Sequence, residues 1–502
     1  MMTLLTSEQT READRFTITR KGIPSLDLME SAAAAFVSVF KGYYIFRDVS
    51  ISIYCGTGNN GGDGLAIARL LKEQGYDRLS VKIARFSQTL AEDFRSNEER
   101  LRLTGIEIKN FSTSEQFPLE DAEILIDALL GSGLSRPLEG DFEKLAGHLN
   151  RLGKTIVSVD VPTGFPTEGL IDKESTIVNA ELVISFQRPK INFFFPESAP
   201  FIKRFRFVNI GLDEPFIQSQ TGGWKLLEPD DIRQVIKPRE AFSHKGTYGH
   251  ALIVAGSRET MGAALLCADA CLHTGAGLTT ACIPVEGLSA LNSSAPEVMA
   301  LTRSDTEELT ADLRKYQAIA IGPGLGIEDL QIKLLRYILA HNQSPLVLDA
   351  DALNILSKHP DLMSQLPRHA ILTPHVKEFD RLFGAHRNWW ERILTARAMA
   401  AKHEIVIVLK NQYTFIIRPD NNVIINPTGN PAMASGGMGD VLTGMIAAFL
   451  AQGYSAEEAA MAGCYLHGKA GDILKEKSGM HSIPPRYLIR KLPEVIGSYS
   501  AD

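Results

Sequence analysis

A glycine-rich turn near the carboxyl end of the chain leads into an aspartate at the start of a predicted helix. Gly436-Gly437-Met438-Gly439 is followed by Asp440. Amides at a helix N-terminus bind anions and can stabilise charge on a phosphoryl group during its transfer. Asp440 is placed to accept the proton of an attacking hydroxyl. The alternative is that Asp440 only caps the helix, but a cap alone would not require the glycines before it.

Three loops in the first half follow apolar runs that predict strands. Residues 56–64 (GTGNNGGDG) contain five glycines in nine residues, which are expected to allow positive φ and a close approach of a ligand to the backbone. Asp127 precedes Gly131-Ser132-Gly133, and Asp160 precedes Thr163. A single strand-end aspartate more often caps a turn. Three such loops at one edge of a parallel sheet mark the expected position of a binding site.

Alternating apolar runs and amphipathic segments predict the elements that position these loops. In the first half we expect strands at residues 49–55, 81–86, 123–130, 155–161 and 182–186, and helices at 64–74, 91–103 and 142–152. This alternation indicates parallel strands with helices on both faces, a Rossmann-like doubly wound α/β sheet.

A second alternation begins after the polar, aperiodic residues 213–224. Strands are expected at 251–255, 278–283, 318–321, 346–349, 370–372 and 405–409, then a hairpin at 414–418 and 422–426, with the last long helix starting near Gly439. We therefore predict an N-terminal domain at 1–212, a linker at 213–224 and a C-terminal α/β domain at 225–502.

The composition is that of an ordinary globular protein, with 44% hydrophobic and 22% charged residues among 502. The net charge of −7 argues against nucleic acid as the main partner. Five scattered cysteines indicate reduced thiols. The polar N-terminus lacks the apolar run of a signal peptide, and no apolar stretch approaches the ~20 residues needed to cross a bilayer. We expect a cytoplasmic protein without a membrane partner.

The N-terminal motifs NNGGDG, IDALLGSG and VDVPTG together resemble the NAD(P)H-hydrate epimerase domain, the YjeF N-terminal family. The resemblance implies a potassium ion held by Asn60, Asp127 and Thr163, and we take Asp160 as the candidate proton shuttle. A helix containing Leu28-Met29-Glu30 resembles the segment that closes the family's pocket. The substrate-binding residues implied are Asn59, Asn60, Gly61, Gly62, Asp63, Gly131, Ser132, Gly133, Leu134, Ser135, Arg136, Pro137 and Asp160.

Six C-terminal motifs, in order, resemble the ribokinase-like fold and, within it, the ADP/ATP-dependent NAD(P)H-hydrate dehydratases: HKGTYG, GPGLG, LDADALN, ILTPH, NPxGN and GGMGDVL. The resemblance implies that Asp440 is the base and a substrate contact, and that Ala263, Gly326 and His375 face the hydrate. Considered alone, His375 would more often be structural. The nucleotide-binding residues implied are Lys410, Asn411, Gln412, Tyr413, Thr414, Asn430, Ser435, Gly436, Gly437, Met438 and Gly439.

Together these resemblances imply an enzyme that epimerises the R and S forms of hydrated NADH and NADPH. It would then dehydrate the S form with ADP and Mg²⁺, releasing AMP and phosphate, and a homo-oligomer is expected. The alternative is a ribokinase-type small-molecule kinase fused to a non-catalytic nucleotide-binding module. That alternative leaves the polar residues of the N-terminal motifs unexplained.

Overall fold

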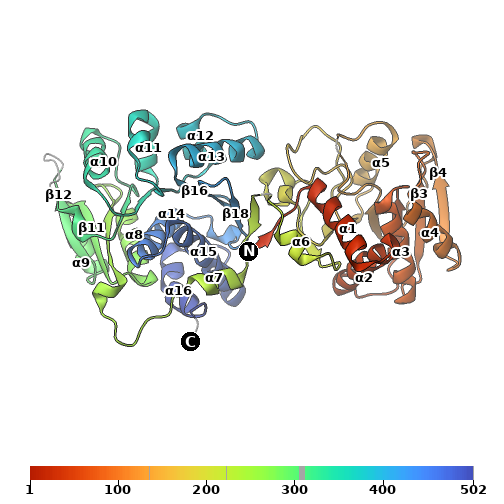
Figure 1. Cartoon of the computed structure of the whole chain (residues 1–502), viewed down its shortest axis with the longest axis horizontal. Coiled ribbons are helices and arrows are strands. Elements are labelled where there is room, and N and C mark those ends of the chain that lie inside the picture. The colour runs from red at the N-terminus through yellow and green to blue at the C-terminus, as the bar shows by residue number, and fades with distance from the viewer. Residues whose placement is uncertain (135, 222, 305–310, 501–502) are drawn as a thin grey trace. The chain divides into compact units, whose positions relative to one another are not determined.

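The computed structural model describes residues 1–134, 136–221, 223–304 and 311–500 (Figure 1). The chain forms two compact units. One comprises residues 3–222, and the other comprises residues 223–502 together with Met1 and Met2. Strand β1 (Met2–Thr3) begins at the second residue of the chain.

The first unit contains a seven-stranded sheet in the order β4-β3-β2-β5-β6-β7-β8. Every neighbouring pair in it is parallel. In the order of the chain the strands read 3-2-1-4-5-6-7, so the winding reverses between β2 and β5, where open α/β sheets bind ligands. The strands are β2 (Ile51–Cys55), β3 (Leu79–Ala84), β4 (Glu107–Phe111), β5 (Ile124–Ala128), β6 (Thr155–Val159), β7 (Leu182–Phe186) and β8 (Phe205–Val208).

Helices cover both faces of this sheet because its strands alternate apolar side chains between the faces. Ile53 of β2 packs in a buried cluster with α2, α3 and α4, whereas the adjacent Tyr54 packs in a second cluster with α5. The helices are α1 (Ser7–Lys21), α2 (Ser25–Tyr43), α3 (Asn59–Glu73), α4 (Glu92–Arg102), α5 (Gly140–Arg151) and α6 (Glu214–Gln218).

The second unit repeats the same winding. Its parallel strands lie in the order β12-β11-β10-β13-β14-β15-β16, again 3-2-1-4-5-6-7. The sheet continues through the antiparallel β17 and β18 to β9, which is parallel to β18. The strands are β9 (Trp224–Leu226), β10 (His250–Val254), β11 (Leu278–Pro284), β12 (Met299–Arg303), β13 (Ala318–Ile321), β14 (Leu346–Leu348), β15 (Ile371–Leu372), β16 (Val406–Leu409), β17 (Thr414–Ile417) and β18 (Val423–Asn426).

The core of this unit is built around α14, which is buried along nearly its whole length. Helices α7, α8, α15 and α16 share its apolar cluster with one face of the sheet, while α10 to α13 lie toward the other face (Figure 1). The helices are α7 (Pro229–Val235), α8 (Met261–Thr274), α9 (Leu288–Ser294), α10 (Asp329–His341), α11 (Asp351–Lys358), α12 (Val376–Phe383), α13 (Trp389–His403), α14 (Met438–Ala451), α15 (Ala456–Ser478) and α16 (Pro485–Gly497).

The α/β class and most strands agree with the sequence prediction, and the differences have physical causes. Five strands, β1, β4, β8, β9 and β12, were not predicted. The partly exposed residues of β4, β8 and β12 lack an apolar run, and β1 and β9 are only two and three residues long. The expectation that the last long helix starts near Gly439 was wrong, since α15 and α16 follow it. Part of the predicted linker is the helix α6, whose Ile217 is buried among residues of the first unit.

Among the described residues, no single helix is both long and apolar enough to cross a membrane. Helices α1 and α2 meet the length and composition test only as a pair bent by 116°.

Contact between α8 and α14 depends on Gly444, and this generates a stability prediction. A Cβ at Gly444 would lie 2.1 Å from the Cys267 carbonyl oxygen, whereas one at Gly262 of α8 would meet nothing within 4 Å. We predict that Gly444→Ala destabilises the second unit by ~1–3 kcal/mol or more through overpacking. Gly262→Ala should leave it unchanged or stabilise it by up to ~1 kcal/mol.

Tryptophan fluorescence in urea measures this unit alone, because all three tryptophans (Trp224, Trp389 and Trp390) lie within it. Equal urea midpoints for the two variants would contradict the prediction.

Candidate functional site

A cavity of about 420 Å³ opens at the carboxyl edge of the first sheet, above β2, β5 and β6. It lies at the switch point between β2 and β5. Eight of the predicted substrate-binding residues line it: Asn59, Asn60, Asp63, Gly131, Ser132, Gly133, Leu134 and Asp160.

A second cavity of about 480 Å³ shares Arg11 and residues 132–134 with the first. The predicted residues Arg136 and Pro137 line this cavity. Ser135, also predicted, lies outside the described residues. The two cavities therefore adjoin one another at Arg11 and residues 132–134.

The glycine-rich loop folds differently from the sequence expectation. Helix α3 already begins at Asn59, so Asn59 to Asp63 form its first turn. None of the five glycines in residues 56–64 has a positive φ. Four of them are needed for close packing instead: a Cβ at Gly61, for example, would lie 1.9 Å from the Gly56 carbonyl oxygen, and one at Gly64 2.6 Å from the Ala128 Cβ. Gly58 is the exception, because a Cβ there would meet nothing within 4 Å. Gly61 and Gly62 do not line the cavity.

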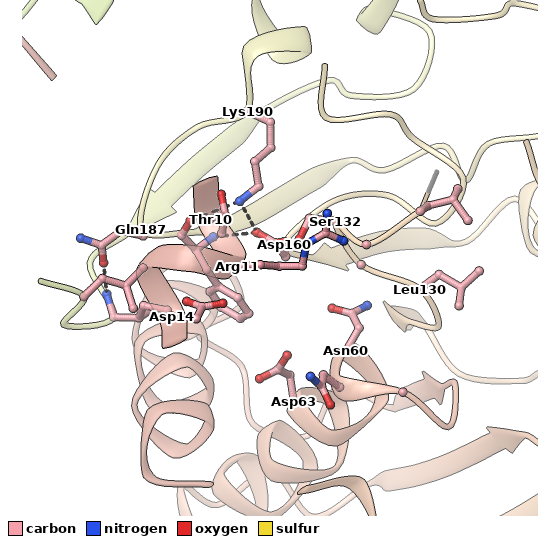
Figure 2. Close-up of a pocket in the computed structure, with 18 of the residues that line it drawn as sticks. Thr10, Arg11, Asp14, Asn60, Asp63, Leu130, Ser132, Asp160, Gln187 and Lys190 are labelled. Atoms are coloured by element: carbon pink, nitrogen blue, oxygen red, sulfur yellow. Dashed lines mark hydrogen bonds and ion pairs between the residues drawn. The ribbon is translucent and has the colours of Figure 1, made fainter. Parts of the chain in front are cut away.

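The helix that closes the cavity is α1 and not the predicted Leu28-Met29-Glu30 segment. Thr10, Arg11 and Asp14 of α1 line the cavity (Figure 2). Met29 is buried instead and would contact any side chain added at Gly62.

Asp127 is a buried hydrogen-bonding centre beneath the cavity. Its Oδ1 accepts from the Thr163 hydroxyl at 2.6 Å and the Leu129 amide at 3.3 Å, and its Oδ2 accepts from the Ser158 hydroxyl and the Thr163 amide, both at 2.9 Å. Burial nevertheless raises the pKa of Asp127, and the hydrogen bonds only partly offset this. The Asn60 Nδ2 is also buried and has no partner among the described residues. Three predicted potassium ligands thus occupy this region, two of them in direct contact.

Asp160 follows β6 with a left-handed backbone, φ 64°, a conformation that aspartate tolerates better than most residues. Its carboxylate lies 2.7 Å from the Lys190 Nζ and accepts from the Phe186 amide at 3.0 Å. Burial would raise the pKa of Asp160, but Lys190 and the hydrogen bonds outweigh burial and lower it. Asp160 is therefore held as a carboxylate.

The carboxyl edge of the second sheet brings together the predicted dehydratase residues. Asp440 is the third residue of α14, and the helix N-cap is Gly437, at φ 92°. Among the described residues, the Asp440 side chain has no hydrogen-bond partner; only burial and neighbouring charges act on its pKa. Burial, followed by the charges of Asp349 and Asp351, raises the pKa of Asp440 to about 6 against the opposing effect of Lys410.

Lys410 is paired within the protein. Its Nζ lies 2.8 Å from Asp349 Oδ1, and the Thr443 hydroxyl donates to Asp349 Oδ2 at 2.8 Å. Lys410 follows β16, Asp349 follows β14 and Thr443 lies on α14. This buried pair joins the sheet edge to the helix that carries Asp440.

Hydrogen bonds join the loops that carry the other predicted residues. The Thr260 hydroxyl donates to the Gly324 carbonyl at 2.6 Å, which brings the start of α8, with Ala263, to the loop that contains Gly326. The Gly326 amide donates to Asp351 Oδ2 at 2.9 Å. His375 caps α12 through its Nδ1, with half of its side chain exposed.

The predicted nucleotide-binding residues lie on two segments that also touch. Gln412, between β16 and β17, donates to the Gly429 carbonyl at 3.1 Å. Asn430 donates to Asp472 Oδ1 at 2.9 Å, and the Ser435 hydroxyl donates to the Ile483 carbonyl at 3.0 Å. The side chains of Asn430 and Ser435 therefore shape the turn before α14.

Sequence reasoning missed four charged residues of these sites: Arg11, Asp14, Lys190 and Asp349. Asp349 stood in a recognised motif, LDADALN, but no role followed from it. Arg11 and Asp14 lie on an amphipathic N-terminal helix whose sequence gave no sign of its position over the sheet edge. Lys190 follows β7 and could have been found as a basic residue at a strand end.

Both halves of the chain match known families. Residues 25–192 match the family described as YjeF-related protein N-terminus, and residues 251–494 match the family described as NAD(P)H-hydrate dehydratase. In Bacillus subtilis, the ADP/ATP-dependent NAD(P)H-hydrate dehydratase crystallised with ATP and Mg²⁺ is 32% identical. It aligns with a TM-score of 0.50 over 55% of this chain and 99% of its own.

Whole-length relatives carry both halves. The bifunctional NAD(P)H-hydrate repair enzyme Nnr of Moorella thermoacetica is 33% identical over 99% of this chain and 97% of its own. Its namesake in Escherichia coli K12 is 32% identical over 90% and 85%. A ribokinase-type small-molecule kinase fused to a non-catalytic nucleotide-binding module is not favoured, since these bifunctional relatives align with both halves of the chain. The chain belongs to the family of bifunctional NAD(P)H-hydrate repair enzymes.

Proposed function

We propose that the first unit epimerises hydrated NADH and NADPH and that the second dehydrates the S epimer with ADP. The observation that carries this proposal is the position of Asp440, whose half-buried carboxylate directly follows the glycine turn at the start of α14. The direct test is to incubate the protein with hydrated NADH and ADP and to follow the absorbance of dihydronicotinamide. No recovery of absorbance with ADP or ATP would refute the dehydratase function.

In the proposed epimerase site, the hydrated nicotinamide ring occupies the cavity above β2, β5 and β6. Its C6 hydroxyl lies beside the ring nitrogen, whose lone pair can expel it as water once the oxygen is protonated. The resulting cation would lie near the Asp160 carboxylate, which stabilises positive charge. The second cavity, with Arg11 and Arg136, offers space and charge for the rest of the dinucleotide.

The residues around Asp127 suit a potassium ion. A buried carboxylate with a raised pKa lacks a compensating cation. Two of its four hydrogen bonds come from hydroxyl groups, whose protons can rotate away, and their oxygens are the ligands that hard cations prefer. Rotation of the Asn60 amide would place its oxygen where the unpartnered Nδ2 now lies. Potassium would supply positive charge beneath the cavity.

In the proposed dehydratase site, the C6 hydroxyl of the S hydrate attacks the β-phosphorus of ADP and gives its proton to Asp440. AMP leaves, and amides of the 436–439 turn stabilise the charge on the phosphoryl group. The C6–O bond then breaks, phosphate departs, and loss of a proton from C5 restores the dihydropyridine. Magnesium would neutralise charge on the nucleotide phosphates.

ADP is proposed as the phosphoryl donor because the two activities are fused in one chain, and ATP is the alternative that the assay compares. We also propose a homo-oligomer and a cytoplasmic location. The location is supported by the five cysteines, which are all free and buried, as in proteins of reducing compartments.

Replacing the proposed dehydratase base generates a first functional prediction. Asp440→Asn keeps the size of the side chain but removes the proton acceptor, so dehydration should fall by ~10²–10⁴-fold. Epimerisation and ADP affinity should be unchanged. Because the base must be ionised, wild-type dehydration should rise as pH rises through about 6. Rates from pure S hydrate and ADP titration calorimetry measure these effects.

The matched control is Asp329→Asn, which changes an exposed aspartate in the first turn of α10. It should retain wild-type rates. Near-wild-type dehydration by Asp440→Asn would show that the base lies elsewhere.

A second prediction concerns the cation. Epimerisation should be faster in potassium chloride than in tetramethylammonium chloride at equal ionic strength, while dehydration of pure S hydrate should not differ. Potassium should also raise the Tm of the first unit by mass action, as measured by calorimetry. Asp127→Asn should lose both responses. Equal epimerisation in the two salts would exclude a functional potassium site.

A further inference from the structure

Three carboxylates from three elements surround the first cavity. Asp14 lies on α1, Asp63 on α3, and Asp160 after β6, and all three line the same space (Figure 2). Expelling a hydroxyl as water and returning water to the other face requires a group that gives up and regains one proton near neutral pH. The three environments decide which carboxylate can do this.

The Asp160 carboxylate already has ion-pair and hydrogen-bond partners within the protein. The Lys190 ammonium and the Phe186 amide hold one of its oxygens, and the Ser185 hydroxyl donates to the same oxygen at 3.2 Å. Groups that hydrogen-bond the ionised form disfavour its protonation. Asp160 is thus suited to carry a permanent negative charge and poorly suited to deliver a proton.

The pKa of Asp63 is shifted in the opposite direction, because its surroundings disfavour the ionised form. Burial, followed by the charges of Asp160, Asp14 and Asp93, raises its pKa well above the usual value. No described residue forms an ion pair with Asp63. These surroundings favour the protonated form of Asp63 and oppose release of its proton.

Asp14 lies between these extremes. Its carboxylate makes no hydrogen bond or ion pair with any described residue, and it lines the cavity. The charged groups around it are Lys190 and Asp160 from the sheet edge, Asp63 from α3 and Arg11 on its own helix. Burial, partly offset by Lys190 and reinforced by Asp160, raises the pKa of Asp14 to about 6.

We propose that Asp14 is the catalytic acid and base of epimerisation, while Asp160 remains ionised and stabilises the cationic ring. The assignment rests on the proposed epimerase function. The Asp14 proton passes to the C6 oxygen, the C6–O bond breaks with the nitrogen lone pair forming a C=N bond, and water leaves. Water then adds to C6 from the other face and returns one proton to Asp14. No oxidant or co-reactant is needed.

The test uses the full chain with Asp14→Asn, Asp14→Glu and the control Glu12→Gln, an exposed residue of the same helix. Epimerisation of pure R hydrate is followed by chromatography in H₂¹⁸O, after subtraction of the spontaneous rate. Mass spectrometry of the hydrate reports each C–O cleavage, because water that returns carries the label. Dehydration of S hydrate by the same preparations shows that each variant is folded.

The expected result for Asp14→Asn is a fall in the kcat of epimerisation of ~10²–10⁴-fold, with an equal loss of ¹⁸O incorporation. KM and dehydration should be little changed. Asp14→Glu should recover part of the rate, and Glu12→Gln should match the wild type. Because the productive form of Asp14 is protonated, wild-type kcat/KM should fall as pH rises through about 6, and this limb should be absent from Asp14→Asn.

Near-wild-type kcat or ¹⁸O incorporation in Asp14→Asn would overturn the assignment, as would a defect confined to KM. These outcomes leave the epimerase function intact. If the wild-type protein itself neither epimerised the hydrate nor incorporated ¹⁸O, the proposed function would fail and the assignment with it.

Discussion

At each of the two buried sheet edges, aspartates outnumber the lysines that could pair with them. The chemistry proposed for both units follows from this imbalance. In the first, Lys190 pairs with Asp160; in the second, Lys410 pairs with Asp349. Removing one partner of such a buried pair typically costs ~3–5 kcal/mol, because the other charge is left uncompensated. Each lysine is therefore occupied by one aspartate, and the neighbouring carboxylates Asp14 and Asp440 form no ion pair with any described residue.

Those neighbouring carboxylates, Asp14 and Asp440, are the groups proposed to transfer protons. Asp14 and Asp440 lie on helices, each beside the paired aspartate of its own sheet edge, and the pKa of each is raised to about 6. Their proposed roles are opposite, since Asp14 starts as the protonated acid and Asp440 starts as the ionised base. In both units, then, a second aspartate lies beside a lysine–aspartate pair. In the first unit this aspartate is the proposed acid, and in the second it is the proposed base.

Both sheets wind in the order 3-2-1-4-5-6-7, and the sequence predicted the strands that carry the sites because these are buried and apolar. The motifs located Asp127, Asp160 and Asp440 for the same reason: Asp127 lies at the end of a recognisable strand, Asp160 follows one, and Asp440 follows a glycine turn. The sequence could not place α1 over the cavity, since an amphipathic helix does not specify which surface it covers. Nor could it distinguish glycines that adopt positive φ from those, such as Gly61 and Gly64, that allow close packing.

The five cysteines have a consequence for the conditions in which this chain can work. Burial raises the pKa of every one, to about 11 for Cys282 and about 12 for Cys271 and Cys464, with Cys55 and Cys267 shifted in the same direction. Oxidants and electrophiles attack the thiolate and need access to it. Because the folded chain offers neither, we expect peroxide and alkylating agents to react with these cysteines only after local unfolding exposes them.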